Sequence, residues 1–197
     1  MNNKKIRFLT ITAILGALAT VFQMFEIPVP VLVPGFIKLD FSDLPAILAT
    51  FLVSPLSGVI VCLIKNIIHI ATSSSVGIGE LANFLTSAAC VLPAGIIYKR
   101  NKTRKGALIA MLTGTLCFSL MGIMSNYFIM FPFYTTLMNI PMEAIIGMCQ
   151  KILPFIDSQF EVILLSVTPA NLIKGIAVSI VTFLLYKRLS PILKKFS

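Results

Sequence analysis

The stretch TPANLIKG, residues 168–175, lies inside the last long apolar run of the chain, VILLSVTPANLIKGIAVSIVTFLLY, residues 162–186. At a rise of about 1.5 Å per residue, this run is long enough to cross a bilayer as a helix. Asn171 and Lys174 are three positions apart, so both side chains project from one face of that helix. A lysine at the centre of a spanning helix costs roughly 2.5 to 3.5 kcal/mol on insertion scales. We therefore expect a carboxylate or a ligand beside Lys174.

The composition around this run is that of a membrane protein. Of the 197 residues, 57% are hydrophobic, and the mean hydropathy is +0.98, which is too apolar for an ordinary soluble domain. No water-soluble segment is long enough to form a second domain. We therefore expect residues 1–197 to form one compact integral membrane bundle.

The net charge of +9 is distributed unevenly along the chain. Twelve of the 16 basic residues form three clusters at the ends of apolar runs, and all seven acidic residues lie between those clusters. This positive-inside pattern predicts a multi-pass protein of the cell membrane, with both termini and the loop at 99–105 in the cytoplasm. Nucleic acid is not an expected partner, because its binding needs a solvated basic face. The basic clusters are Lys4, Lys5, Arg7; Lys99, Arg100, Lys102, Arg104, Lys105; and Lys187, Arg188, Lys194, Lys195; the acidic residues are Glu26, Asp40, Asp43, Glu80, Glu143, Asp157 and Glu161.

The apolar runs also predict the number of spans. We expect an all-α integral membrane protein with six transmembrane helices in one bundle. An amphipathic helix that starts near Asn139 and ends at Pro154 is expected at the membrane interface, between helices five and six. The expected spans are residues 4–25, 44–53, 56–71, 80–98, 107–130 and 162–186.

Two segments next to the second span depart from this regular pattern. Residues 26–36 contain three prolines, so we expect an outer loop there, apolar enough to fold back against the mouth of the bundle. The second span is short, with Ser42 or Asp43 as its cap, which predicts an outer end recessed below the membrane surface.

The first span carries a face of small residues. Ala13 and Ala17 are four positions apart, a spacing that allows close approach of a second helix. The spacing fits packing inside the bundle and docking on a separate partner protein equally well.

Polar residues within the spans gather at one level. By position along each run, all of them lie in the middle or outer half of the membrane, with Asp40 at the start of the second span. A channel needs polar groups along its whole length, whereas a pocket open to the outside and sealed inside does not. Asparagine amides both donate and accept, which suits a neutral or weakly polar ligand, and Phe41, Tyr127 and Phe128 offer ring surface. The intramembrane set is Lys65, His69, Glu80, Asn83, Asn126, Asn171 and Lys174.

Several kinds of chemistry lack a motif in this sequence. The four cysteines are scattered singly and there is one histidine, so no metal site is expected. No ATP site or catalytic dyad is present, so uphill transport would need energy from other subunits. Two alternatives remain open: an intramembrane enzyme that uses Glu80 and His69, and a membrane scaffold held by structural ion pairs, such as Lys65 with Glu80 or Lys174 with a carboxylate.

Five segments together resemble a known family. They are residues 38–45 (KLDFSDLP), Gly58 with Lys65 and Asn66, residues 79–84 (GELANF), residues 125–127 (SNY) and residues 169–175 (PANLIKG). The chain is similar to the substrate-binding S components of energy-coupling factor (ECF) vitamin transporters, and specifically to the riboflavin-specific members. Ala13 and Ala17 resemble the motif in the family's first span.

The resemblance implies a riboflavin-binding subunit of an ECF-type ABC transporter. Its expected partners are riboflavin, membrane lipid, a transmembrane coupling subunit and two ATPase subunits; no cofactor is expected. In the family, residues matching Asn126, Asn171 and Lys174 bond the polar edge of the flavin ring. The resemblance also places Leu39, Asp40, Phe41, Glu80 and Asn83 in the pocket wall, and we include Lys65 and Tyr127 as further candidates. The alternatives are FMN or a flavin analogue, and an S component for another vitamin or a nucleobase-like precursor.

Overall fold

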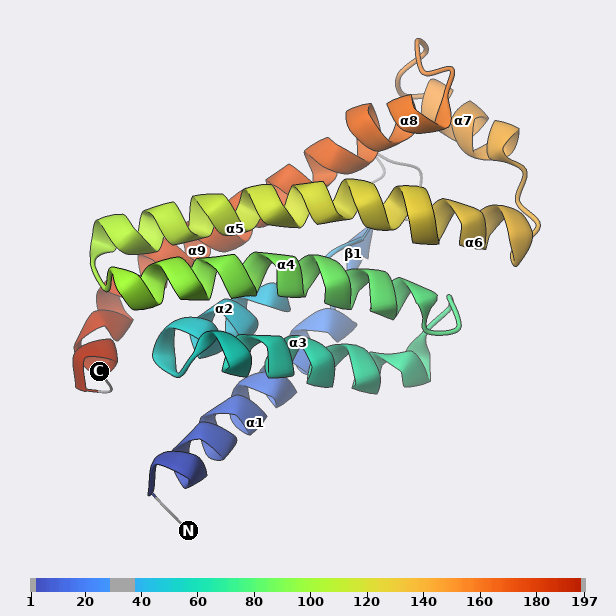
Figure 1. Ribbon diagram of the computed structural model, residues 1–197. Coiled ribbons are helices and arrows are strands. Elements are labelled where there is room, and N and C mark those ends of the chain that lie inside the picture. The colour runs from blue at the N-terminus through green and yellow to red at the C-terminus, as the bar shows by residue number, and fades with distance from the viewer. Residues whose placement is uncertain (1–2, 29–37, 196–197) are drawn as a thin grey trace.

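A computed structural model describes residues 3–28 and 38–195 (Figure 1). Helices dominate it, and one pair of two-residue strands joins the first two helices. The elements are α1 (Asn3–Met24), β1 (Ile27–Pro28), β2 (Lys38–Leu39), α2 (Asp43–Leu52), α3 (Pro55–His69), the 3-10 turn η1 (Ile70–Thr72), α4 (Ile78–Arg100), α5 (Arg104–Ser125), the π-helix η2 (Asn126–Met130), α6 (Phe131–Thr136), α7 (Met142–Gln150), α8 (Gln159–Val162), the π-helix η3 (Ile163–Val167) and α9 (Thr168–Lys195).

The predicted helical membrane fold is confirmed. In the described part of the chain, five helical segments are long and apolar enough to cross a bilayer. The remaining expected span, the second, corresponds to α2, which has ten residues and is shorter than the other five. The five long segments are Lys5–Met24, Pro55–Thr72, Ile78–Arg100, Arg104–Thr136 and Gln159–Leu185.

Local sequence explains where the helices start. The Ser54 hydroxyl accepts a hydrogen bond from the Ser57 amide, and Pro55 fits the first turn of α3 because that position needs no N–H donor. Thr103 caps α5 in the same way, by accepting from the Gly106 amide. Ser42 occupies the cap position predicted for α2, but without the capping hydrogen bond. Its hydroxyl accepts a hydrogen bond from a buried lysine instead.

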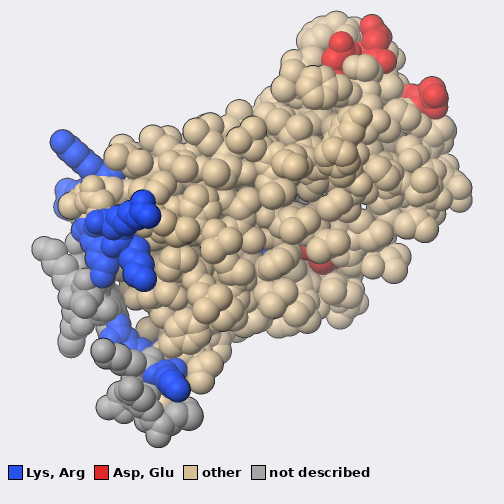
Figure 2. Space-filling model, viewed as in Figure 1, with Lys and Arg blue, Asp and Glu red and all other residues tan. Residues whose placement is uncertain are grey.

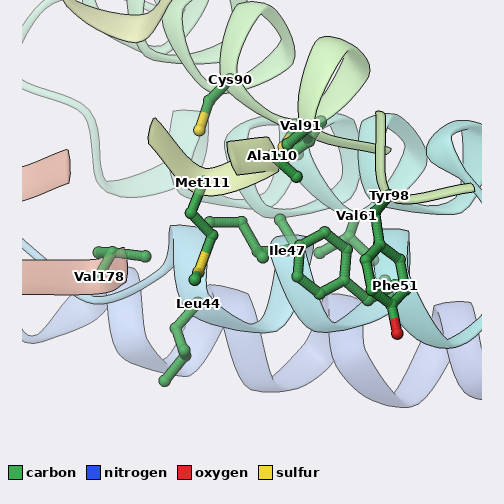
Figure 3. Packing of buried hydrophobic residues seen from close by; sticks show 14 of the residues in the cluster. Leu44, Ile47, Phe51, Val61, Cys90, Val91, Tyr98, Ala110, Met111 and Val178 are labelled. Carbon is green, nitrogen blue, oxygen red and sulfur yellow. The ribbon is translucent and has the colours of Figure 1, made fainter. Parts of the chain in front are cut away.

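Helix α2 lies at the centre of the bundle. Eight of its ten residues are buried, and the helix packs against α1, α3, α4 and α9. Figure 3 shows Leu44, Ile47 and Phe51 of this core, the last stacked on the Tyr98 ring with 4.2 Å between ring centroids. Gly58 on α3 allows this packing, since an added Cβ would come within 2.9 Å of the Ala46 carbonyl oxygen. The interior of the bundle around α2 is therefore filled by closely packed apolar side chains.

The charges separate along the length of the bundle. Figure 2 shows basic side chains at one end, and acidic side chains mostly at the other. The start of α1, the end of α9 and the α4–α5 connection share the basic end (Figure 1). This arrangement agrees with the predicted positive-inside topology, in which the basic end faces the cytoplasm.

Three details differ from the sequence-based expectations. The fifth span is longer, because the helix continues through Met130 to Thr136. Helix α7 occupies the place of the expected amphipathic helix but ends at Gln150, before the proline expected to stop it. The strand pair β1–β2 holds the ends of the proline-rich loop together, with Ile27 opposite Leu39. The expected folding of that loop over the bundle mouth concerns residues 29–37, which lie outside the described residues.

Candidate ligand-binding site

A cavity of about 380 Å³ lies among the helix ends that face away from the apolar core around α2. Its volume is within the range of about 300–1,000 Å³ typical of small-molecule sites. Side chains from α1, α3, α4, α5, η2 and α9 line it, together with residues next to β2. Seven of the ten predicted binding residues form part of the wall: Leu39, Asp40, Glu80, Asn83, Asn126, Asn171 and Lys174.

Lys174 is held by two carboxylates. Its Nζ lies 2.9 Å from Asp40 Oδ2 and 3.0 Å from Asp43 Oδ2, and its side chain is 8% exposed. The ring of Phe118 lies below the same ammonium group, with 5.6 Å from Nζ to the ring centroid. Of the two partners expected beside Lys174, a carboxylate or a ligand, the structure thus shows carboxylates. The amide nitrogen of Asn126 donates a hydrogen bond to the Gly122 carbonyl.

Lys65 contacts the other carboxylate oxygen of Asp43. Its Nζ lies 2.7 Å from Asp43 Oδ1 and donates to the Ser42 hydroxyl at 2.6 Å. The Ser87 hydroxyl also donates to Asp43 Oδ1, at 2.5 Å. The pairing of Lys65 with Glu80 considered from the sequence is therefore wrong, since Asp43 on the neighbouring helix α2 lies closer to the lysine.

The cluster of Asp40, Asp43, Lys65 and Lys174 contains two acidic and two basic side chains. Their opposite charges offset one another, which meets the requirement that buried charges be paired. Asp43 joins three helices, because it contacts lysines from α3 and α9 and lies itself on α2. Asp40 and Lys174 of this cluster line the cavity, whereas Asp43 and Lys65 are buried and do not line it.

A second polar cluster lies around His69, at another part of the wall. Nδ1 of His69 lies 2.9 Å from Glu80 Oε1, and Nε2 lies 3.7 Å from Glu26 Oε1. The hydroxyls of Ser73 and Ser75 donate to Glu80 Oε2 at 2.7 and 3.1 Å. These contacts hold the Glu80 carboxylate in place at the start of α4.

Asn126 and Asn171 are positioned by neighbouring helices. Gly122 lies against the Asn171 amide, and a Cβ at this glycine would collide with Nδ2 of Asn171. Both helices contain a π-turn near these residues: η2 begins at Asn126, and η3 ends one turn before Asn171. Single π-turns widen a helix locally and are frequent at functional sites. Asn126, Asn171 and Lys174 thus meet at one side of the cavity.

Comparison with known proteins decides the family. A model of the family described as ECF transporter, substrate-specific component, matches residues 7–186, nearly the whole chain. The chain belongs to this family. The resemblance drawn from the sequence motifs is thereby confirmed.

Named relatives agree with this assignment. The riboflavin transporter RibU of Staphylococcus aureus (strain TCH60) is 36% identical over 190 residues, which cover 96% of this chain and 93% of that protein. The riboflavin transporter FmnP of Bacillus subtilis (strain 168) is 30% identical and covers 95% of this chain and 94% of its own length. A solved structure, described as the S component of a bacterial ECF transporter, has a TM-score of 0.75 and 33% identity, with 96% of this chain and 99% of that chain covered. These relatives are transporters, so the chain is a transport component and not an enzyme.

Three of the predicted binding residues do not line the cavity that the described residues form. Lys65 is fully enclosed behind Asp43. Phe41 and Tyr127 are each 45% exposed, with their rings on the surface. Their roles in binding stay predictions.

The structure adds wall residues that the sequence did not single out as ligand contacts. Phe118 supplies the ring surface beside Lys174, and Gln23 from α1 lies on the side of Glu26 and His69. Phe118 looks like an ordinary member of an apolar span, so the sequence carries no signal for it, whereas Gln23 is an amide near the outer end of the first span, the same signal that singled out Asn126 and Asn171. Among the described residues, no group of three or more His, Cys, Asp or Glu side chains could hold a metal ion.

Proposed function

We propose that this S component binds riboflavin in the described cavity and passes it inward with the help of an ATP-driven coupling module. The observation that carries the proposal is the meeting of Asn126, Asn171 and Lys174 at one side of the cavity, in a chain whose relatives are named riboflavin transporters. The flavin pyrimidine edge alternates C=O and N–H groups. Asparagine amides complement such an edge because they carry both a donor and an acceptor.

Lys174 retains capacity for a ligand although it is paired. An ammonium group has three N–H donors, and the hydrogen bond to Asp40 and the ion pair with Asp43 engage at most two of them. The third is available to a flavin carbonyl, in a charge-assisted bond worth roughly 1.5–3 kcal/mol. The Phe118 ring beneath the ammonium group offers a surface for the flavin ring. Leu39, Glu80 and Asn83 would then surround the ribityl chain.

A fluorescence-quenching titration tests the proposed ligand. Flavin fluorescence is followed as purified, ligand-free protein is added to riboflavin, FMN or an unrelated vitamin. We expect saturable quenching with riboflavin at a ratio of one to one, and a yellow chromophore in protein purified without ligand removal. Saturable binding of the unrelated vitamin, with none of either flavin, would support the alternative of an S component for another precursor.

Docking on a coupling subunit is proposed for the small-residue face of α1. Ala13 and Ala17 are exposed, whereas Gly16 points inward, where an added Cβ would lie 3.2 Å from the Ile64 side chain. The small face is therefore free for a partner helix. Replacing both alanines with leucine should abolish riboflavin uptake in cells but leave binding to the purified protein intact. Loss of binding in the purified protein would instead mean that this face packs within the bundle.

We also propose six spans with both termini in the cytoplasm, the short α2 being the second. The test uses single cysteines at Glu143 and Lys105, exposed residues at the acidic and basic ends, in a background without native cysteines. A membrane-impermeant reagent added to intact cells should label Glu143→Cys and not Lys105→Cys. The reverse labelling pattern would mean that the protein has the opposite orientation in the membrane.

A further inference from the structure

Gln23 carries a buried acceptor without a partner. It lies near the end of α1, is 1% exposed and forms part of the cavity wall. No residue in the described ranges 3–28 and 38–195 donates a hydrogen bond to its Oε1 atom. An unsatisfied buried acceptor costs stability, so such an atom in a ligand cavity points to a donor that arrives with the ligand.

The orientation of the Gln23 amide follows from its neighbours. Asn66 on α3 donates through Nδ2 to the Cys62 carbonyl at 2.8 Å, so the amide of Asn66 must present Oδ1 on its other side. That oxygen accepts from Gln23 Nε2 at 3.3 Å. With Nε2 committed to Asn66, the oxygen of the Gln23 amide is the atom left over.

Two carboxylates, Glu26 and Glu80, lie in the same part of the cavity wall as Gln23. One turn beyond Gln23, Glu26 faces His69, which lies one turn beyond Asn66, so α1 and α3 form two successive polar contacts. Glu80 approaches the same histidine from α4. A ligand with several hydroxyl donors matches this side of the cavity, whereas the Lys174 side offers donors to carbonyl groups.

We propose that Gln23 Oε1 accepts a hydrogen bond from a hydroxyl of the ligand's polyol chain, so that Gln23 selects flavins that carry such a chain. This inference rests on the proposed binding of riboflavin. It assigns Gln23 a role in specificity and not merely in packing α1 against α3. An apolar side chain of the same length at this position would remove the acceptor and keep the packing.

The test compares riboflavin with lumiflavin, whose side chain is a single methyl group, on the Gln23→Met variant. The matched control is Thr20→Val, one turn earlier on α1, where a buried hydroxyl bonds only its own helix at Gly16 and does not line the cavity. We expect Gln23→Met to weaken riboflavin binding about tenfold and lumiflavin binding less than twofold. Thr20→Val should change neither affinity by more than about twofold. The melting temperature of ligand-free Gln23→Met reports separately on the hydrogen bond from Gln23 Nε2 to Asn66 Oδ1, which the variant also removes, so the difference between the two flavins decides the role in specificity.

Two results would overturn the inference. Equal losses for both flavins, with a lower melting temperature of the ligand-free variant, would mean that Gln23 serves only to hold α1 against α3. Unchanged riboflavin affinity would mean that Oε1 has no ligand partner. Failure of the wild-type protein to bind riboflavin would be a different result, because it would overturn the proposed function itself.

Discussion

Lys65 and Lys174 lie in different spanning helices, and the ammonium groups of both contact Asp43, yet their surroundings differ. Lys65 is enclosed by protein, with Ser42 and Asp43 as its partners, and it does not line the cavity. Lys174 contacts a second carboxylate, that of Asp40, and forms part of the cavity wall. A buried lysine in a membrane span is therefore not by itself a sign of a ligand. Its position relative to a cavity separates a structural lysine from a binding one.

The comparison also separates two effects of removing a charge. Each lysine offsets negative charge on the α2 side of the cluster, so removal of either one leaves a buried carboxylate less well paired. Only at Lys174 does removal also take a donor from the cavity. Stability and ligand affinity, measured on the same variants, distinguish the two residues.

The largest expected effect is loss of stability in Lys65→Met. This variant keeps the aliphatic stem and removes the charge, which leaves Asp43 Oδ1 and the Ser42 hydroxyl without the ammonium donor. We expect the ligand-free protein to lose roughly 3–5 kcal/mol, the usual cost of breaking a buried ion pair. Thermal unfolding in detergent measures it, with Lys151→Met, an exposed lysine beyond α7, as the control. A melting temperature equal to that of the control would contradict the structural role of Lys65.

The next prediction concerns Lys174→Met. This variant should lose stability for the same reason and should also weaken riboflavin binding, by roughly 1.5–3 kcal/mol for the lost charge-assisted bond. Adding Asp40→Asn removes one of the carboxylates left behind, so the double variant should recover stability but not affinity. Thermal unfolding and flavin titration on both variants test this. Recovery of affinity together with stability would show that Lys174 acts only through the fold.

The sequence was sufficient for the class of fold and for much of the cavity wall. Long apolar runs and the positive-inside pattern identified the membrane helices, because the bilayer imposes length and composition directly on a sequence. Polar residues in the outer halves of the spans identified Asn126, Asn171 and Lys174, since such residues are costly there without a role.

The ion-pair partners could not be predicted in the same way. An acidic residue before an apolar run commonly caps a helix, so the sequence predicts this role for Asp43. Its contacts with Lys65 and Lys174 span 22 and more than 100 positions of sequence, and they depend on how α2 is enclosed by α3 and α9. Phe118 could not be predicted for the same reason, because only packing between helices brings its ring to the cavity, whereas the polar side chain of Gln23 in the first span was a usable signal.

Asn171→Ala tests the ligand side of the comparison without touching the ion pairs. Asn171 lines the cavity one turn before Lys174 and contacts neither aspartate within the described network. Riboflavin binding should weaken by roughly 1–3 kcal/mol, because a polar group on the flavin edge would lose its partner. The melting temperature of the ligand-free protein should stay near that of the wild type. A large fall in this temperature with unchanged affinity would contradict the assignment.

The smallest expected effect comes from Gly122→Ala, which alters the position of a binding side chain and none of its chemistry. The new methyl group would occupy the space of the Asn171 amide, which must then shift away from Gly122. We expect riboflavin affinity to fall about fivefold, near 1 kcal/mol, the size of one poorly aligned hydrogen bond. Gly147→Ala on α7 is the matched control, because an added Cβ there meets no atom within 4 Å. If both variants bound riboflavin as tightly as the wild type, Asn171 would not need its present position, and the recognition of the flavin edge would rest on Lys174 and Asn126.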